Sequence, residues 1–236
     1  MIQGFLWDLD GVLTNTTTLH RDSWIEALSN SLTLNDSELL TASFQNMFTG
    51  VPRAVGIRRF LQSINENGQD CIDIETQAVK IAKYKNDIFV RKLHCTDIEV
   101  FPDALDLLSW SQSVGLKNGL ASQSENADAV IDVTNLRKYL DACATGITAR
   151  EAQIESKPHH RFYEHAAEKL GVNIESCICF EDTYAGIYSA VTAKSAMCIG
   201  VARDLSSSLE IMSAGADLVT RDLKSIKMLL LGIIEQ

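Results

Sequence analysis

The chain has 236 residues, a formal net charge of −10 and a sequence pI of about 4.9. Hydrophobic residues make up 46% and charged residues 22%, a balance typical of globular proteins. An acidic chain without clusters of Lys or Arg is poorly suited to nucleic acid or an anionic membrane, so we expect neither as a partner.

The sequence contains no predicted targeting or membrane segment. Its first residues, MIQGFLWDLDGVL, lack a basic segment and carry an acid pair, which argues against a signal peptide. The apolar stretch Ile226–Ile234 is too short to span a bilayer. The six cysteines form no C-x-x-C pair, which favours buried thiols over zinc or disulfides. We expect a cytoplasmic, monomeric protein.

The first predicted element is a buried parallel strand, because Gly4–Trp7 is a short apolar run. The following segment Thr16–Leu93 carries no convincing strand. Within it, Ile81, Tyr84 and Ile88 recur at helical spacing. The sequence therefore predicts a small helical domain inserted after the first strand.

Strands and helices alternate in the rest of the chain. The predicted strands are Asn118–Ala121, Ala142–Thr145, Cys177–Phe180, Ala196–Val201 and Asp217–Val219. The predicted helices are Asp103–Val114 capped by Asp103, Ser124–Val133 capped by Ser124, His160–Leu170 closed by Gly171, Tyr184–Val191, Leu205–Ser213 and Leu223–Ile234. This alternation predicts an α/β fold: a doubly wound, Rossmann-like parallel-sheet core (residues 1–15 and 94–236) with an inserted α-helical cap (residues 16–93).

Two carboxylates follow the first strand in the run Asp8-Leu9-Asp10-Gly11-Val12. Ligands of such sheets bind beyond the carboxyl ends of the strands. One carboxylate can act as a nucleophile toward phosphorus, and the other as a general acid and base. Alternatively, Asp10-Gly11 is only a turn and Asp8 only a cap.

A second acid pair, Glu181-Asp182, also follows an apolar strand. If both pairs share a crevice, carboxylates about 4 Å apart repel by roughly 4 kcal/mol at an effective dielectric of about 20. A hard cation with oxygen ligands relieves this repulsion, and Mg²⁺ suits a phosphoryl site. As an alternative, the pair is solvated at a helix N-terminus, where negative charge is favoured.

Two further segments are suited to binding an anion. Ser122 lies where a strand runs into a helix, so its hydroxyl and neighbouring N–H groups can bind a phosphoryl group, unless it is a plain helix cap. Lys157, followed by Pro158, can neutralise phosphoryl oxygens, unless it is an exposed loop lysine.

Taken together and in order, these motifs resemble the haloacid dehalogenase superfamily of aspartate-dependent phosphotransferases. The matching segments are Phe5–Thr14, Leu120–Ser124, Ser156–Pro158 and Phe180–Ile187. The resemblance implies that Asp8 is the nucleophile and Asp10 the general acid and base. It implies that Mg²⁺ is held by Asp8, the main-chain carbonyl of Asp10, Glu181 and Asp182. The implied phosphoryl-binding residues are Ser122, Gln123 and Lys157.

The predicted cap is similar to that of the β-phosphoglucomutase subfamily, through His20, Trp24, the segment Gly50-Val51-Pro52-Arg53 and the segment Lys83-Tyr84-Lys85-Asn86. This resemblance implies that Arg53 grips the distal phosphate of a sugar bisphosphate, in keeping with bidentate recognition by arginine. It implies that His20 and Lys85 contact the substrate and couple cap closure to the acid and base. Closure would exclude water and favour transfer to a sugar over hydrolysis.

Asn15 and Glu125 are among the positions that depart from the subfamily pattern, whereas Ser124 and Asn126 match it. Asn15 stands where many relatives carry Asp, which could alter the hinge. Glu125 stands where the mutases usually carry a lysine near the distal phosphate, and a negative charge there should weaken that site unless Glu125 turns away.

Three functions stay open on these grounds. The resemblance implies a β-phosphoglucomutase that interconverts β-glucose 1-phosphate and glucose 6-phosphate, with glucose 1,6-bisphosphate as intermediate and activator. The second is a Mg²⁺-dependent sugar-phosphate phosphatase, favoured by Glu125. The third, of another class, is a non-catalytic binding protein on this fold. In each case the expected ligand is a small phosphorylated sugar.

Overall fold

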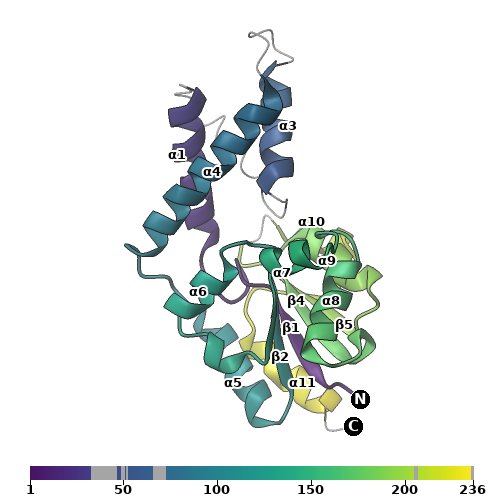
Figure 1. Cartoon of the computed structure of the whole chain (residues 1–236). Helices are drawn as coiled ribbons and strands as arrows, with labels where there is room; N and C mark the ends of the chain where they lie inside the picture. Colours follow the sequence, from purple (N-terminus) through teal and green to yellow (C-terminus); the bar gives the residue numbers. More distant parts are fainter. Residues whose placement is uncertain (33–46, 49–50, 52, 66–72, 205–206, 235–236) are drawn as a thin grey trace. The chain divides into compact units, whose positions relative to one another are not determined.

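The computed structural model describes residues 1–32, 47–48, 51, 53–65, 73–204 and 207–234 (Figure 1). The chain forms two compact units. One combines Met1–Asn15 with Ile98–Gln236, and the other is Thr16–Asp97. The predicted cap ends four residues earlier, at Leu93.

The first unit is built on a six-stranded parallel sheet, in the order β3-β2-β1-β4-β5-β6. The strands are β1 (Gly4–Trp7), β2 (Lys117–Ala121), β3 (Ala142–Ala144), β4 (Cys177–Glu181), β5 (Met197–Val201) and β6 (Leu218–Thr220). The predicted α/β fold is confirmed, with strand bounds within one residue of those expected. Because β1 lies between β2 and β4, the ends of all three strands are neighbours at one edge of the sheet.

Helices cover both faces of this sheet. They are α5 (Pro102–Ser113), α6 (Ala127–Val133), α7 (Gly146–Glu151), α8 (Arg161–Leu170), α9 (Tyr184–Thr192), α10 (Ser208–Ser213) and α11 (Lys224–Ile234). Leu6 of β1 lies in a buried cluster with α8, α9 and α10. The next residue, Trp7, points to the other face, where its indole donates to Asn118 Oδ1, which also accepts from Ser111 of α5. Alternate strand residues therefore fill two separate cores, as a doubly wound sheet requires.

Two predicted helix caps are wrong. α5 begins with Pro102 after the extended residue Phe101, and Asp103 makes no cap but is buried in an ion pair with Arg203. The helix predicted from Ser124 begins at Ala127, because the Ser124 hydroxyl accepts from the N–H of Asn126 in the preceding turn. A side-chain hydrogen bond within the turn thus replaces the predicted cap, and the helix begins three residues later than expected.

In the described part of the first unit, one α-helix was not predicted. α7 begins after Thr145, which was assigned to the end of a strand. Thr145 accepts from the N–H of Thr148, and the Thr148 hydroxyl accepts from the N–H of Thr145, so the two residues form a reciprocal cap. The predicted start of α10 at Leu205 lies outside the described residues.

The described part of the second unit consists of α1 (Thr17–Leu32), α3 (Arg53–Asn65) and α4 (Ile74–Leu93), and it contains no strand. Its core includes Trp24, which stacks on Phe48 at 4.2 Å between ring centroids. Trp24 is 4% exposed, so it is a core residue of the unit.

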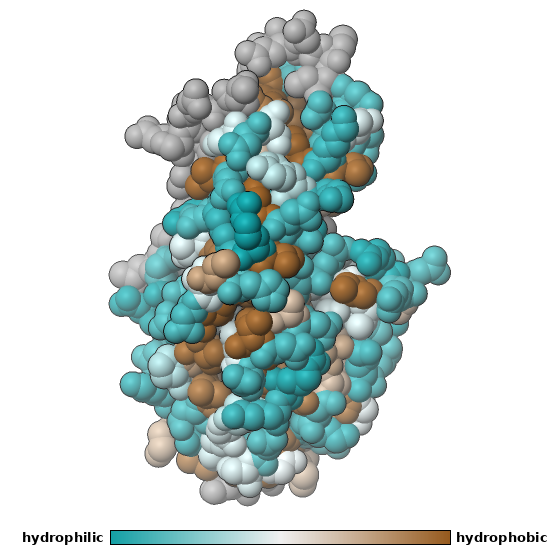
Figure 2. Space-filling view, turned by 60° about the vertical axis from the view of Figure 1, so that its left-hand side comes forward, coloured by the Kyte–Doolittle hydropathy of each residue, from teal (hydrophilic) through white to brown (hydrophobic). Residues whose placement is uncertain are grey.

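Hydrophilic residues cover much of the face seen in Figure 2, interrupted by scattered apolar ones. Among the described residues, no helix combines the length and apolar character needed to cross a membrane. Five cysteines lie in the described ranges, all as free thiols, and Cys177, Cys179 and Cys198 are buried.

Candidate active site

The first side of the site is a tight turn after β1. The N–H of Asp8 still pairs with Phe180 of β4, at 3.0 Å, and the turn then closes through Thr14 N to Leu9 O at 2.9 Å and Gly11 N to Thr14 O at 2.8 Å. Gly11 has φ +92°, and a Cβ there would overlap Asp182 Oδ2. A residue without a side chain is therefore needed for Asp182 to approach the turn.

Lys157 joins the strand ends on the other side. Its buried ammonium donates to Asp8 Oδ1 at 2.7 Å, to the main-chain carbonyl of Ala121 at 2.7 Å, and to Glu181 Oε1. These three acceptors come from the ends of β1, β2 and β4. One cation thus holds the ends of three neighbouring strands, with two buried carboxylates as its counter-charges.

Glu181 is held by several neighbours in a fully buried position. Besides Lys157, the phenol of Tyr163 donates to its Oε1 at 2.7 Å, and the N–H of Asp182 donates to its Oε2 at 3.3 Å. A Cβ at Gly186 would overlap the carboxylate. Sequence reasoning missed Tyr163, because no local pattern connects a residue of α8 to an acid 18 positions away.

Burial is the largest single influence on the pKa values of Asp8, Asp182 and Lys157. It raises the pKa of Asp8 from 3.8 to about 8; the charge of Lys157 opposes this shift, while those of Glu181 and Asp10 add to it. Burial and the charges of Asp8 and Glu181 raise the pKa of Asp182 well above its usual value. Burial lowers the pKa of Lys157, but Asp8 and Glu181 raise it more, so its net shift is upward. The site has more negative charge than a single lysine can compensate.

The acids fit a divalent cation. Carboxylate oxygens of Asp8, Glu181 and Asp182 lie within 4.8 Å of one another. Asp182 Oδ1 is buried and has no hydrogen-bond partner among the described residues. An unpartnered buried oxygen is costly, and a hard cation with oxygen ligands would satisfy it. Asp10 lies near enough to Asp8 for its charge to raise the pKa of Asp8.

The loop after β2 carries the other predicted phosphoryl-binding residues. The N–H of Ser122 donates to Ala144 O at 3.0 Å, so it is not available to an anion. The Ser122 hydroxyl accepts from the N–H of Ser124 at 3.2 Å, which leaves its own proton to donate. Gln123 Oε1 is buried without a partner among the described residues, and Asn126 is buried at the start of α6.

The two departures from the subfamily pattern both have partners within the first unit. The carboxylate of Glu125 forms an ion pair with Arg150 of α7, so a cation accompanies the negative charge. The side-chain amide of Asn15 donates to Glu99 Oε2 at 3.0 Å, and its N–H donates to Glu99 O at 2.9 Å. An aspartate at position 15 would instead oppose the Glu99 carboxylate.

The predicted substrate contacts of the second unit lie in described positions. Lys85 is buried on α4, and its Nζ lies 2.8 Å from His20 Nδ1 and 4.6 Å from the centre of the Phe89 ring. Arg53 is the first residue of α3 and is partly exposed. Gly50 and Pro52 of the matched segment lie outside the described residues.

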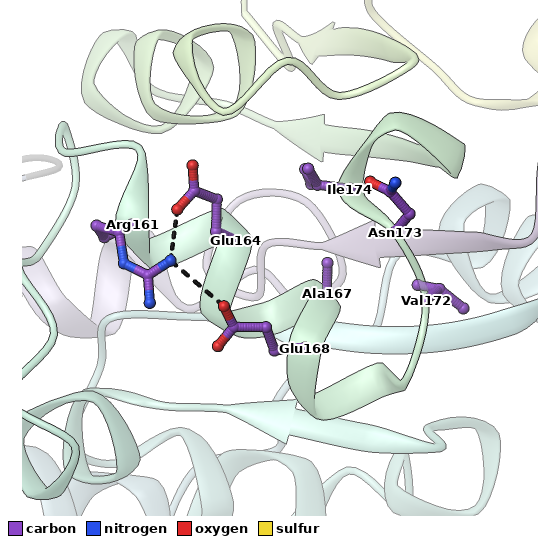
Figure 3. Close-up of a pocket in the computed structure, with 7 residues that line it drawn as sticks. All are labelled: Arg161, Glu164, Ala167, Glu168, Val172, Asn173 and Ile174. Carbon is purple, nitrogen blue, oxygen red and sulfur yellow. Dashed lines mark hydrogen bonds and ion pairs between the residues drawn. The ribbon is translucent and has the colours of Figure 1, made fainter.

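A separate shallow pocket lies on α8 and the segment that follows it (Figure 3). Its charged lining residues pair with one another: Arg161 forms ion pairs with Glu164 at 2.6 Å and with Glu168 at 3.3 Å. None of the predicted site residues lines this pocket, so it is not part of the candidate active site.

Fold and site together define an α/β protein with three clustered carboxylates and a buried lysine at the carboxyl edge of a parallel sheet. Residues 2–194 match the sequence profile of haloacid dehalogenase-like hydrolases, and the chain belongs to this family.

A β-phosphoglucomutase of Mycobacterium bovis is 27% identical over 95% of this chain and 91% of its own. The fructose-1-phosphate phosphatase YqaB of Escherichia coli is 28% identical over 80% of this chain and 92% of its own. The crystal structure of a β-phosphoglucomutase from Clostridium difficile superimposes with a TM-score of 0.78, at 26% identity, covering 98% of this chain and 96% of that one. The chain is therefore similar in sequence to relatives of both phosphomutase and phosphatase type.

Proposed function

We propose that the protein is a Mg²⁺-dependent phosphotransferase that acts on a small sugar phosphate through an aspartyl-phosphate on Asp8. The observation that carries this proposal is the buried contact of Lys157 with both Asp8 and Glu181, beside the unpartnered oxygen of Asp182. A structural role alone would not require three acids and a lysine at the same strand ends.

The geometry suggests how the chain would act. Lys157 holds Asp8 Oδ1, which leaves Oδ2 to form a bond to phosphorus as the bond from phosphorus to the sugar oxygen breaks. The departing sugar oxygen takes a proton from Asp10. When a second hydroxyl attacks the phosphorus and the bond from phosphorus to Asp8 breaks, the proton of that hydroxyl passes to Asp10. Mg²⁺ held by Asp8, Asp10, Glu181 and Asp182 would neutralise phosphoryl oxygens and favour the ionised acids. Ser122 and Lys157 would bind the transferred group, with Gln123 beside them.

Within this class we propose β-phosphoglucomutase as the specific activity. His20, Lys85 and Arg53 would contact the sugar phosphate from the cap, with Ser124 and Asn126 on the core side. The pairing of Glu125 with Arg150 supports this choice, because it accounts for the negative charge that favoured a phosphatase. A sugar-phosphate phosphatase is the second candidate, supported by the phosphatase of E. coli among the relatives.

The test is a coupled assay of purified protein with β-glucose 1-phosphate, Mg²⁺ and a trace of glucose 1,6-bisphosphate. Glucose 6-phosphate and free phosphate are measured together. We expect glucose 6-phosphate without free phosphate, lost in Asp8→Asn and retained in Asp132→Asn, an exposed control acid paired with Arg137. Free phosphate alone would identify a phosphatase, and no Mg²⁺-dependent turnover of any phosphate ester would leave a binding protein.

A further inference from the structure

An arginine beyond β5 contacts the turn that follows β1. Arg203 Nη1 pairs with Asp103 Oδ2 at 2.6 Å, and its Nη2 donates to the carbonyl of Val12 at 3.0 Å. The guanidinium carbon lies 4.0 Å from the centre of the Phe101 ring. The proposed reaction assigns no role to this group.

The carbonyl of Val12 belongs to the turn that carries Asp10. Residues 9–14 form a closed loop in which Leu9 O accepts from the N–H of Leu13 at 3.0 Å and of Thr14 at 2.9 Å. Asp10 lies opposite Thr14 in this loop. Val12 lies between Gly11 and Leu13, whose N–H groups bond within the loop, and its carbonyl accepts instead from Arg203, so this donor adds a restraint from outside the loop.

The loop is also tied to the chain segment that returns to the core. Thr14 pairs with Val100, and the N–H of Phe101 donates to Leu13 O at 2.9 Å. Arg203 therefore contacts both segments at once, through the carbonyl of Val12 and the ring of Phe101. A planar group with several donors suits this double contact better than a lysine would.

Asp103 connects Arg203 to the start of α5 and to the segment before α11. Its Oδ2 also accepts from the N–H of Leu223, at 2.7 Å, and its Oδ1 accepts from the N–H of Ala104, at 2.9 Å. The carboxylate thus joins the start of α5 to the segment before α11. Its residue is 7% exposed, so the ion pair with Arg203 is shielded from solvent.

We propose that Arg203, held by Asp103, is a positioning residue that fixes the turn of residues 9–14 and thereby aims the Asp10 carboxyl at the leaving oxygen. This inference rests on the proposed role of Asp10 as general acid and base. A misplacement of about 1 Å in a catalytic group can reduce a rate about 100-fold. We call the Arg203–Asp103 pair the clamp. Removing it should therefore affect proton transfer by Asp10 more than attack by Asp8.

The leaving group of the substrate separates these two effects. A sugar alkoxide needs a proton as it departs, whereas p-nitrophenolate leaves without one. We expect Arg203→Met, which keeps an apolar stem on Phe101, to lower the single-turnover rate of phosphoryl transfer from a sugar phosphate about 10- to 100-fold. The burst rate of p-nitrophenolate release from p-nitrophenyl phosphate, which precedes any step that needs Asp10, should fall less than about threefold. Asp10→Asn should show the same pattern, and the exposed control Arg137→Met should leave both rates unchanged. Equal losses on both substrates, or none, would overturn the proposal.

Hydrogen exchange provides a readout that does not need turnover. In Arg203→Met we expect the amides of Gly11, Leu13 and Thr14 to exchange at least about tenfold faster, with the strand amides of β1 and β4 unchanged. Asp103→Asn should accelerate the same amides by a smaller factor. If the wild type turns over no phosphate ester, the proposed function fails while this comparison still tests the clamp. Unchanged exchange in the turn would overturn the clamp whatever the activity.

Discussion

Replacing Asp8 by asparagine should stabilise the metal-free protein while abolishing its nucleophile. In the folded chain burial raises the pKa of Asp8 from 3.8 to about 8. Between these two values the folded state binds more protons at this site than the unfolded state. Stability therefore falls as the pH rises from about 4 to 8 and levels off above that range. Asparagine resembles the protonated acid and carries no such penalty.

The expected gain in the free energy of unfolding follows from the raised pKa of Asp8. One pKa unit corresponds to about 1.4 kcal/mol, so the interval from 3.8 to pH 7 corresponds to about 4 kcal/mol. Asparagine also removes a partner of Lys157, which offsets part of this gain. We expect Asp8→Asn to be more stable than the wild type by about 2–4 kcal/mol at pH 7. For a chain of this size this corresponds to a Tm increase of roughly 5–15 °C.

The assay is thermal and urea unfolding of both proteins in EDTA at pH 5, 6, 7 and 8. Asp182 titrates in both proteins, so the informative quantity is the difference between them at each pH. That difference should grow with pH, and added Mg²⁺ should stabilise the wild type more than the variant. Asp132→Asn is the matched control, and it should not stabilise, because Arg137 lowers the pKa of Asp132. A difference that is absent at pH 7 and 8, or constant from pH 5 to 8, would refute the reasoning.

Three further substitutions test the same cluster. Gly11→Ala places a Cβ on Asp182 Oδ2, and Mg²⁺ titration of activity should show about 10- to 100-fold weaker binding; unchanged affinity would contradict the contact. Lys157→Met removes the cation that contacts Asp8 and Glu181, and urea unfolding should show a loss of about 3–5 kcal/mol; an unchanged stability would mean that the two buried acids do not depend on this counter-charge. Tyr163→Phe removes a hydrogen bond to Glu181, and it should cost about 1–3 kcal/mol in the same assay; a smaller loss would show that water replaces the phenol.

Much of the fold could be predicted, because a buried parallel strand is a short, continuous apolar run. Cys177–Phe180 is such a run, and β4 extends it by one residue. The convergence of polar residues at one edge also follows from topology, since strands that all run in one direction end on the same side. For this reason Asp8, Ser122 and Asp182 could be grouped without knowledge of the strand order.

Contacts between distant residues could not be predicted in this way. Asp103 reads as a helix cap because caps are local, yet its partner Arg203 is 100 positions away. Which loops become neighbours depends on the order of the strands, and hydrophobic patterns do not contain that order. The short helix α7 is a different case. Its capping pair, Thr145 and Thr148, is local and visible in the sequence, but the apolar run Ala142–Thr145 predicts that Thr145 ends a strand.

The position of β1 has a consequence for biosynthesis. Its partners on either side lie far along the chain, because they begin at Lys117 and Cys177. While the chain leaves the ribosome, the apolar segment Gly4–Trp7 waits for β2 to gain its first partner strand and for β4 to gain its second. The helical unit, whose contacts lie within Thr16–Asp97, is complete much earlier. Asp8 is thus synthesised well before β4 and reaches its final surroundings only after β4 has emerged.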